Sequence, residues 1–159
     1  FNTNNLMASE IPSGIKLDII HYSCYKDFKI FDIICDDEDL VEYGARLCSI
    51  YKLKKLINHK NPSVREVAYN RLGPKFSFSY MLKDRRKENR SRAVQLSPMH
   101  SKELSVLVFD RSLDIAYDVL EKCPKDLLPL FFRYRKHKGN YWKISDILDL
   151  LKKRMGKLG

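Results

Sequence analysis

Apolar and polar positions recur along this chain with a period of about 24 residues. Residues 53–72, LKKLINHKNPSVREVAYNRL, begin with a short apolar segment, pass through a polar break and end with apolar residues at helical spacing. The same order recurs in residues 30–47, 78–96 and 104–120. Each block therefore predicts a short pair of helices, and the whole pattern predicts an all-α fold.

Aligning the four blocks produces columns of shared chemistry. One column is mostly aliphatic, a second holds an acid or amide at the polar break, a third is alanine, and a fourth is a proline that opens the next block. They are Val41, Val64, Asn89 and Leu113; Asp37, Asn61, Asp84 and Asp110; Ala45, Ala68, Ala93 and Ala116; and Pro74, Pro98 and Pro124. The break residues are expected to cap the second helices by accepting their free N–H groups. Because one block has only a small apolar stripe, neighbouring blocks are expected to stack.

The string from Asn61-Pro62-Ser63-Val64-Arg65 through Ala68 and Leu72 to Pro74 resembles HEAT-like α-solenoid repeats, most of all the short leucine-rich-repeat-variant class. The likeness covers roughly residues 28–132. It implies an α-solenoid of about four to five two-helix repeats with a C-terminal capping helix. In such repeats the arginine that follows the valine column often pairs with a break-column residue. Arg65 and Arg90 are therefore either internal partners of Asn61 or Asp84, or surface cations.

The repeats predict a single domain over residues 11–159, after a flexible tail at residues 1–10. Ser145 is expected to cap the last helix, SDILDLLKKRM, with Ile147, Leu148 and Leu151 facing inward. The expected repeats are 11–27, 28–50, 51–73, 74–97 and 98–123, followed by a cap at 124–159.

The distribution of charge indicates a polyanionic partner. The chain of 159 residues has a formal net charge of +10. Residues 52–102 hold 14 basic and 3 acidic side chains, whereas residues 1–51 hold 4 and 9. A one-sided basic face favours nucleic acid and also fits an acidic protein surface. A solvated lysine-rich surface is the simpler alternative.

Two clusters are the candidate binding residues. Residues 83–92 hold six basic side chains, and with the preceding repeat they predict a ridge over residues 52–92 that contacts phosphates. Residues 131–143 interleave cations with aromatic rings, which suits a nucleic-acid strand because rings stack on bases. Alternatively, Phe131, Phe132 and Trp142 belong to the core. The predicted binding residues are Lys52, Lys54, Lys55, Lys60, Arg71, Lys83, Arg85, Arg86, Lys87, Arg90, Arg92, Arg133, Tyr134, Arg135, Lys136, Lys138, Tyr141 and Lys143.

The sequence contains none of the motifs of phosphate-loop, dinucleotide-binding, zinc-protease or serine-hydrolase sites. Its four cysteines, Cys24, Cys35, Cys48 and Cys123, form no C-x-x-C pair, which favours free thiols in a reducing compartment such as the cytosol or nucleus. We therefore expect no metal, cofactor or small-molecule substrate. We also expect no membrane segment, because no apolar run approaches 18 residues.

These observations lead to two main hypotheses. The first is a non-catalytic helical-repeat protein that binds DNA or RNA through its basic face. The second is a protein-interaction adaptor that docks on an acidic protein surface or a larger nucleoprotein machine such as a polymerase or ribosome, which the acidic run at residues 36–39 fits. The family resemblance implies a third, since some HEAT-like proteins are alkylpurine DNA glycosylases. Asp110 or Asp114, with Trp142 and Tyr117, would then be the catalytic candidates.

Overall fold

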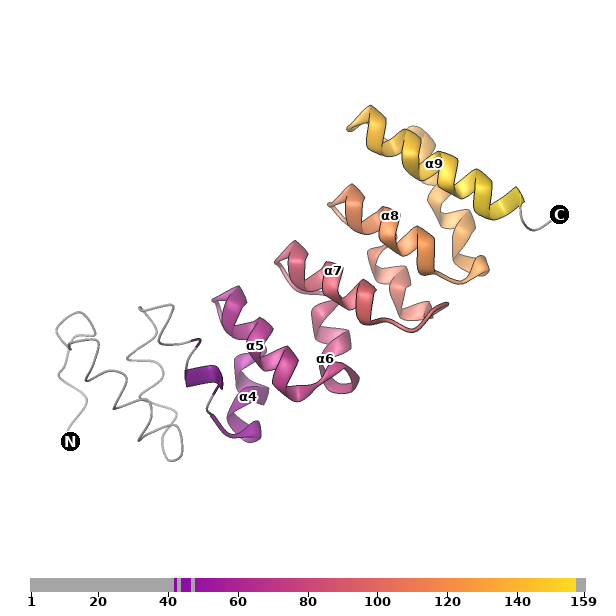
Figure 1. Cartoon of the computed structure of the whole chain (residues 1–159). Coiled ribbons are helices and arrows are strands. Elements are labelled where there is room, and N and C mark those ends of the chain that lie inside the picture. Colours follow the sequence, from indigo (N-terminus) through magenta and orange to yellow (C-terminus); the bar gives the residue numbers. More distant parts are fainter. Residues whose placement is uncertain (1–41, 43, 47, 157–159) are drawn as a thin grey trace, which may run out of the picture. The chain divides into compact units, whose positions relative to one another are not determined.

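The computed structural model describes residues 42, 44–46 and 48–156 (Figure 1). These residues form helices and turns without a strand, which confirms the predicted all-α fold for this part of the chain. The expected tail, the repeat at 11–27 and the column residues Asp37 and Val41 lie outside it. The chain divides into two compact units between Ser77 and Phe78. We call them unit 1 and unit 2 and describe each by itself.

Unit 1 contains a helix pair, α4 (Ile50–Leu56) and α5 (Pro62–Leu72), that packs together. The turn between them ends at Asn61, whose side chain accepts the N–H of Ser63 at 2.9 Å, as expected for a helix cap. Gly73 ends α5 with a φ of +82°, a backbone conformation that glycine adopts without a steric penalty. Val64 and Ala68 are both fully buried, so these predicted inward positions of the pair are confirmed.

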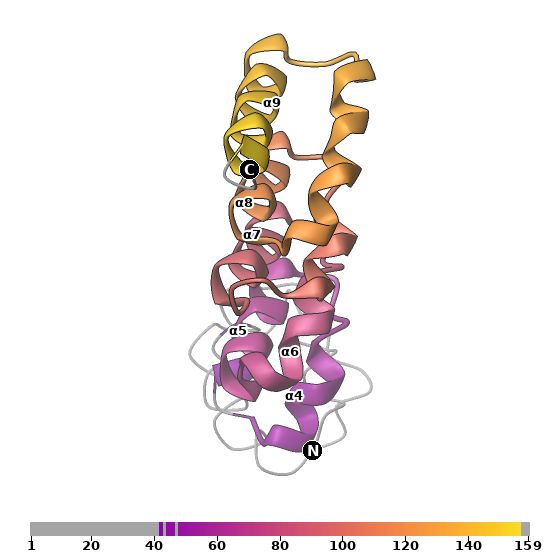
Figure 2. The same ribbon diagram turned by 90° about the vertical axis from the view of Figure 1, so that its right-hand side faces the viewer.

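Unit 2 consists of two layers of helices. In Figures 1 and 2, the α-helices α7, α8 and α9 lie in one layer and the 3₁₀ helices η3 and η4 in the other. Helix α8 packs against both α7 and α9, and η4 packs against α9. The elements are the end of α6 (Pro74–Met81), then α7 (Lys87–Leu96), η3 (Lys102–Leu107), α8 (Leu113–Lys122), η4 (Lys125–Lys136) and α9 (Tyr141–Gly156).

The core of unit 2 lies between these two layers. Helix α8 has the clearest amphipathic pattern and buries Ile115, Ala116, Val119 and Leu120 toward the core. Phe131 of η4 is also fully buried, as one reading of the sequence predicted. Complete burial of such large apolar side chains stabilises the fold by about 1.5–3 kcal/mol each.

Two predicted positions in unit 2, one in the aliphatic column and one helix cap, differ from the observed ones. Counted from the start of its helix, Ile115 is the counterpart of Val64 and Asn89, and it is 2% exposed, whereas Leu113 is only half-buried. The reason is that α8 begins at Leu113, two positions later than an alignment of Leu113 with Val64 and Asn89 implies. Ser145 likewise is not a cap, because α9 already begins at Tyr141.

Asn89 occupies the aliphatic column and is 1% exposed. Its side-chain Nδ2 has no hydrogen-bond partner within the described residues. A buried amide without a partner costs free energy, so this position weakens the packing of α7.

In α8 and in α9, a basic side chain donates hydrogen bonds to carbonyls at the C-terminal end of the preceding α-helix. The side chain of Lys122 in α8 donates to the carbonyls of Val94 and Gln95 at 2.9 and 2.8 Å. Arg154 in α9 donates to the carbonyls of Leu120 and Cys123. Because the last carbonyls of a helix have no partner within it and carry partial negative charge, such cations stabilise the helix end.

Arg71 makes the same kind of contact in unit 1, which differs from its expected place on a binding surface. Its guanidinium donates to the carbonyls of Ala45 and Cys48 at 3.0 and 2.5 Å. The thiols of Cys48 and Cys123 are buried and free, and burial raises the pKa of each above its usual value. Both cysteines are therefore inert structural residues rather than nucleophiles.

Candidate nucleic-acid interface

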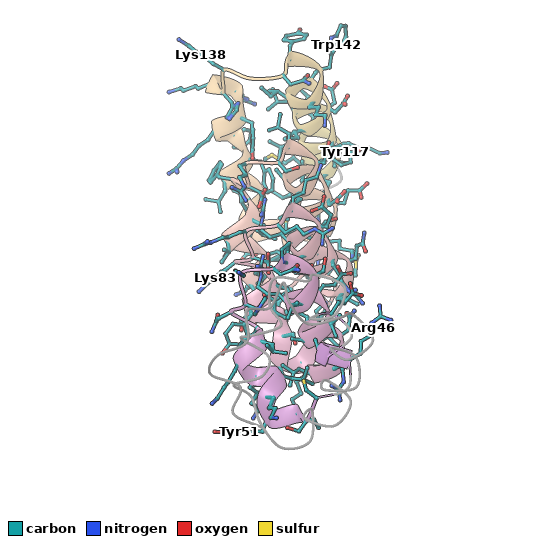
Figure 3. All side chains as sticks on the ribbon, turned by 90° about the vertical axis from the view of Figure 1, so that its left-hand side faces the viewer. Arg46, Tyr51, Lys83, Tyr117, Lys138 and Trp142 are labelled. Atoms are coloured by element: carbon teal, nitrogen blue, oxygen red, sulfur yellow. The ribbon has the colours of Figure 1, made fainter. Side chains whose placement is uncertain are left out.

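The turns that precede α7, α8 and α9 lie along one side of unit 2. We call these turns, residues 83–86, 109–112 and 137–140, together with the first residues of the helices that follow, the N-terminal edge. Figure 3 faces this edge, with Lys83 and Lys138 on one side of the view and Tyr117 on the other. Basic residues gather here at the helix starts, where the partial positive charge of the backbone also favours an anion.

Arg90 fixes the first turn of the edge to the second. Its guanidinium donates to the carbonyls of Asp84 and Arg85 at 2.8 and 3.0 Å, and to both carboxylate oxygens of Asp110 at 2.6 and 2.9 Å. Arg111 reaches back from the second turn and donates to the carbonyl of Arg85. The backbone that carries Lys83 and Arg85 is therefore held in place from two sides.

The two acids of these turns also order the backbone locally. The carboxylate of Asp84 accepts the N–H of Arg86, and that of Asp110 accepts the N–H of Ser112, each at 2.8 Å. In both cases the donor is the residue immediately before the helix, Arg86 for α7 and Ser112 for α8. The predicted capping of the helix N–H groups is therefore found at Asn61, while Asp84 and Asp110 order the preceding turn.

A row of rings joins the second turn to the third. Phe109, Tyr134 and His137 follow one another with ring centroids 5.7 and 5.6 Å apart. The hydroxyl of Tyr134 donates to the carbonyl of Val108 at 2.8 Å, and Arg133 lies over the ring of Phe109 at 5.5 Å. Phe109 is 47% exposed, whereas Tyr134 is 2% exposed and lies in the middle of the row.

The predicted binding residues thus divide into exposed cations and residues with internal roles. Lys60, Lys83, Arg85, Lys87, Lys136 and Lys138 are exposed. Arg90 and Tyr134 are buried and bonded, so their positions do not fit the expected direct contact with a partner. For Arg90 this is the internal pairing that the family resemblance offered, with Asp110 and the Asp84 carbonyl as its partners.

Other predicted cations lie against neighbouring side chains. Lys54 and Lys55 of unit 1 lie over the rings of Phe76 and Tyr51, each 5.4 Å from the centroid. In unit 2, Arg135 lies 4.5 Å from the centroid of Phe132, and Arg86 pairs with Glu88 at 3.2 Å. Lys143 pairs with Asp114 at 2.5 Å. Lys52, Arg86 and Arg92 are half-buried, and Arg133 is exposed on η4.

Three edge residues were not predicted as binding residues. Phe109 and Arg111 lie in the second turn, and Trp142 in the first turn of α9 is 77% exposed rather than part of the core. The position of Trp142 just after the Gly139-Asn140 turn is the signal that could have placed it outside the core, since the first turn of a helix often extends beyond the packed layer.

The outer surface of α8 has the opposite charge. Asp114, Asp118 and Glu121 recur at helical spacing. A groove of about 560 Å³ between α7 and α8 is lined by Asp114 and Asp118 from α8 and by Lys87, Glu88 and Arg92 from α7. Burial, followed by the charges of Glu121 and Asp114, raises the pKa of Asp118. The acids of α8 therefore share this groove with the cations Lys87 and Arg92 of α7.

Both acids that the glycosylase resemblance implies have internal partners. Asp110 is bound by Arg90 and the N–H of Ser112, and Asp114 is paired with Lys143. Tyr117 lines a small groove between α8 and α9 together with Asp114 and Lys143. The described residues contain no cluster of three metal-ligating side chains and no helix long and apolar enough to cross a membrane.

Comparisons of the chain with protein-family models, with curated proteins and with solved structures find no match.

Proposed function

We propose that this chain binds nucleic acid without catalysis, and that the N-terminal edge of unit 2 is its binding surface. The observation that carries the proposal is a row of exposed cations at helix starts, with Lys83, Arg85 and Lys87 at the start of α7 and Lys138 just before α9. Lys83 and Arg85 come from a turn whose backbone is held by the bonds of Arg90 to the carbonyls of Asp84 and Arg85. A preorganised row of cations binds the phosphate backbone independently of sequence.

We also infer that the helix pairs are copies of one repeat, as the resemblance to HEAT-like solenoids implies. Arg65 donates to the carbonyls of His59 and Lys60, and Arg90, 25 positions later, donates to the equivalent carbonyls of Asp84 and Arg85. Small residues end the long helices at a similar interval, each donating its N–H to the carbonyl four positions earlier. They are Cys48, Gly73, Ser97 and Cys123. Such recurrence supports a repeat and with it an extended binding surface.

The test is a fluorescence-anisotropy titration with labelled duplex DNA, single-stranded DNA and an RNA hairpin at two salt concentrations. The variant Lys83→Ala/Arg85→Ala/Lys138→Ala removes three exposed cations of the edge. We expect it to weaken binding at low salt and to reduce the slope of log K against log salt by about 2–3, since each phosphate contact contributes about 0.7–0.9.

The matched control variant is Lys125→Ala/Lys152→Ala/Lys153→Ala, which removes the same charge from exposed positions away from the N-terminal edge. It should bind almost as tightly as the unmodified protein. Equal losses in the two variants would mean that only net charge matters, and the absence of binding to all three probes would refute the proposal.

A second candidate function, docking on an acidic protein, is favoured by one other observation. A groove of about 610 Å³ between η4 and α9 has an apolar floor of Phe132, Leu148, Leu151 and Met155, flanked by Arg135 and Lys152. Such a groove suits an amphipathic segment with acidic edges. If none of the nucleic-acid probes binds, a helical peptide of that composition is the next ligand to titrate, with Leu148→Asp as the variant expected to abolish its binding.

A further inference from the structure

Two large aromatic side chains stand in solvent at the start of α9. Tyr141 is 75% and Trp142 77% exposed, and their rings meet edge to face with centroids 5.8 Å apart and an interplanar angle of 79°. In Figure 3, Trp142 projects from the end of unit 2, away from the packed helices. Such rings contribute little to the core, and their faces are available to a flat, apolar ligand group.

Cations and a second set of rings lie on the same edge. Lys138 is in the turn that leads into α9, and Arg133 lies over the exposed ring of Phe109. The buried Tyr134 holds Phe109 and His137 in one row, as its hydroxyl is bonded to the backbone at Val108. The edge thus presents the open rings of Tyr141 and Trp142, with Lys138 in the turn before them, and the ring of Phe109, over which Arg133 already lies.

A surface that combines exposed aromatic rings with cations is suited to binding unpaired nucleotides. Each nucleotide offers a π-face that stacks on an aromatic side chain and a phosphate that pairs with a lysine or arginine. The bases of a duplex are stacked on one another, so their faces do not reach the rings of a protein surface. A purely electrostatic surface would need no exposed tryptophan.

We propose that the N-terminal edge of unit 2 binds single-stranded nucleic acid, with bases stacked on Trp142 and Tyr141 and phosphates bound by Lys138 and the neighbouring cations. This inference rests on the proposed nucleic-acid function and narrows its ligand to unpaired strands. Both DNA and RNA strands offer base faces and phosphates, so both are included in the test.

Trp142 is the single tryptophan of the chain, so its fluorescence reports directly on this site. The unmodified protein is titrated with single-stranded DNA, single-stranded RNA, the matching DNA duplex and an abasic DNA strand of the same length. We expect strong quenching of the tryptophan by one or both base-containing strands, and little by the duplex or the abasic strand. If one of the two strands quenches the tryptophan more strongly than the other, the difference shows whether the site prefers RNA or DNA.

Affinity is measured in parallel by anisotropy with Trp142→Ala, Trp142→Phe and, as a control, Phe76→Ala, which removes an exposed ring of unit 1. Trp142→Ala should weaken single-strand binding about tenfold, whereas Trp142→Phe and Phe76→Ala should change it less than threefold. Because Trp142 is exposed, unchanged thermal unfolding is expected for its variants.

The possible failures are distinguishable. If the strands bind by anisotropy but leave the tryptophan fluorescence unchanged, and Trp142→Ala binds as tightly as the unmodified protein, the single-strand inference is wrong while nucleic-acid binding stands. Equal affinity for duplex and single strand would overturn it as well. If no probe binds by anisotropy at low salt, the proposed function itself fails, and this inference with it.

Discussion

Arg90 and Asp110, 20 positions apart in sequence, form a two-point ion pair with side chains only 6% and 4% exposed. Both nitrogen–oxygen distances are below 3 Å, and the remaining Nη1 group of Arg90 is bonded to backbone carbonyls. An arginine from the basic cluster at residues 83–92 thus holds two turns together. Its removal is expected to affect stability before it affects binding.

We predict that Arg90→Met lowers the free energy of unfolding by about 3–5 kcal/mol, because Asp110 would remain as a buried carboxylate without its cation. Urea unfolding followed by circular dichroism measures the change. The double variant Arg90→Met/Asp110→Leu should recover much of the loss, since it leaves no buried charge. An Arg90→Met protein as stable as the unmodified one would contradict the structural role and return Arg90 to the binding surface.

Asn89→Leu should stabilise the chain by about 1 kcal/mol. The substitution removes an amide nitrogen that is buried without a partner and places an aliphatic side chain in a column that is otherwise apolar. The same urea titration measures the shift in midpoint. Exposed Asn70→Leu, on α5, is the control and should change stability by less than about 0.5 kcal/mol.

Tyr134→Phe should destabilise unit 2 by about 1 kcal/mol at neutral pH, because the carbonyl of Val108 loses its donor. Burial, and then the charge of Asp110, raise the pKa of Tyr134 to about 12. Its folded-state pKa lies above the unfolded value near 10, so its contribution is complete below pH 10 and is lost as pH rises toward 12. The stability difference between the two proteins should therefore shrink over that window in urea titrations.

Asp118→Asn should stabilise the protein by a few tenths of a kcal/mol at neutral pH, on the scale of about 0.2–0.5 kcal/mol for like charges on one helix face. Because the pKa of Asp118 is raised in the folded state, ionisation disfavours folding, and this cost grows as pH rises above the unfolded value near 3.8. Thermal unfolding should show a gain at pH 7 that disappears below pH 4. A gain that persists at low pH would assign the effect to packing instead.

Sequence alone was sufficient for the helix pairs and for much of the core. Val64, Ala68 and Ala93 lie where the columns placed them, because an apolar stripe at helical spacing has only one face to bury. The phase of α8 was missed, with Ile115 rather than Leu113 inside. Turns of variable length shift the start of a helix by one or two residues, and periodicity does not register such shifts.

The candidate site was harder to predict because exposure depends on contacts between distant positions. The resemblance left Arg90 either paired or on the surface, and only the contact with Asp110, 20 positions away, decides between them. The charge run located the first turn of the edge. The fold, which places the three turns on one side of unit 2, was needed to assign Phe109, Arg111 and Trp142 to the same edge.

The side chains that close helix ends also have a consequence for how unit 2 comes apart. Lys122 ties α8 to α7, and Arg154 ties α9 to α8, each through main-chain oxygens that would otherwise lack a partner. Detaching the last helix would leave the carbonyls at the end of α8 without the guanidinium of Arg154. Fraying from the C-terminal side is therefore opposed by these hydrogen bonds as well as by the apolar core. Neighbouring helix pairs should therefore open cooperatively, and a chain cut before Arg154 should lose cooperativity rather than merely length.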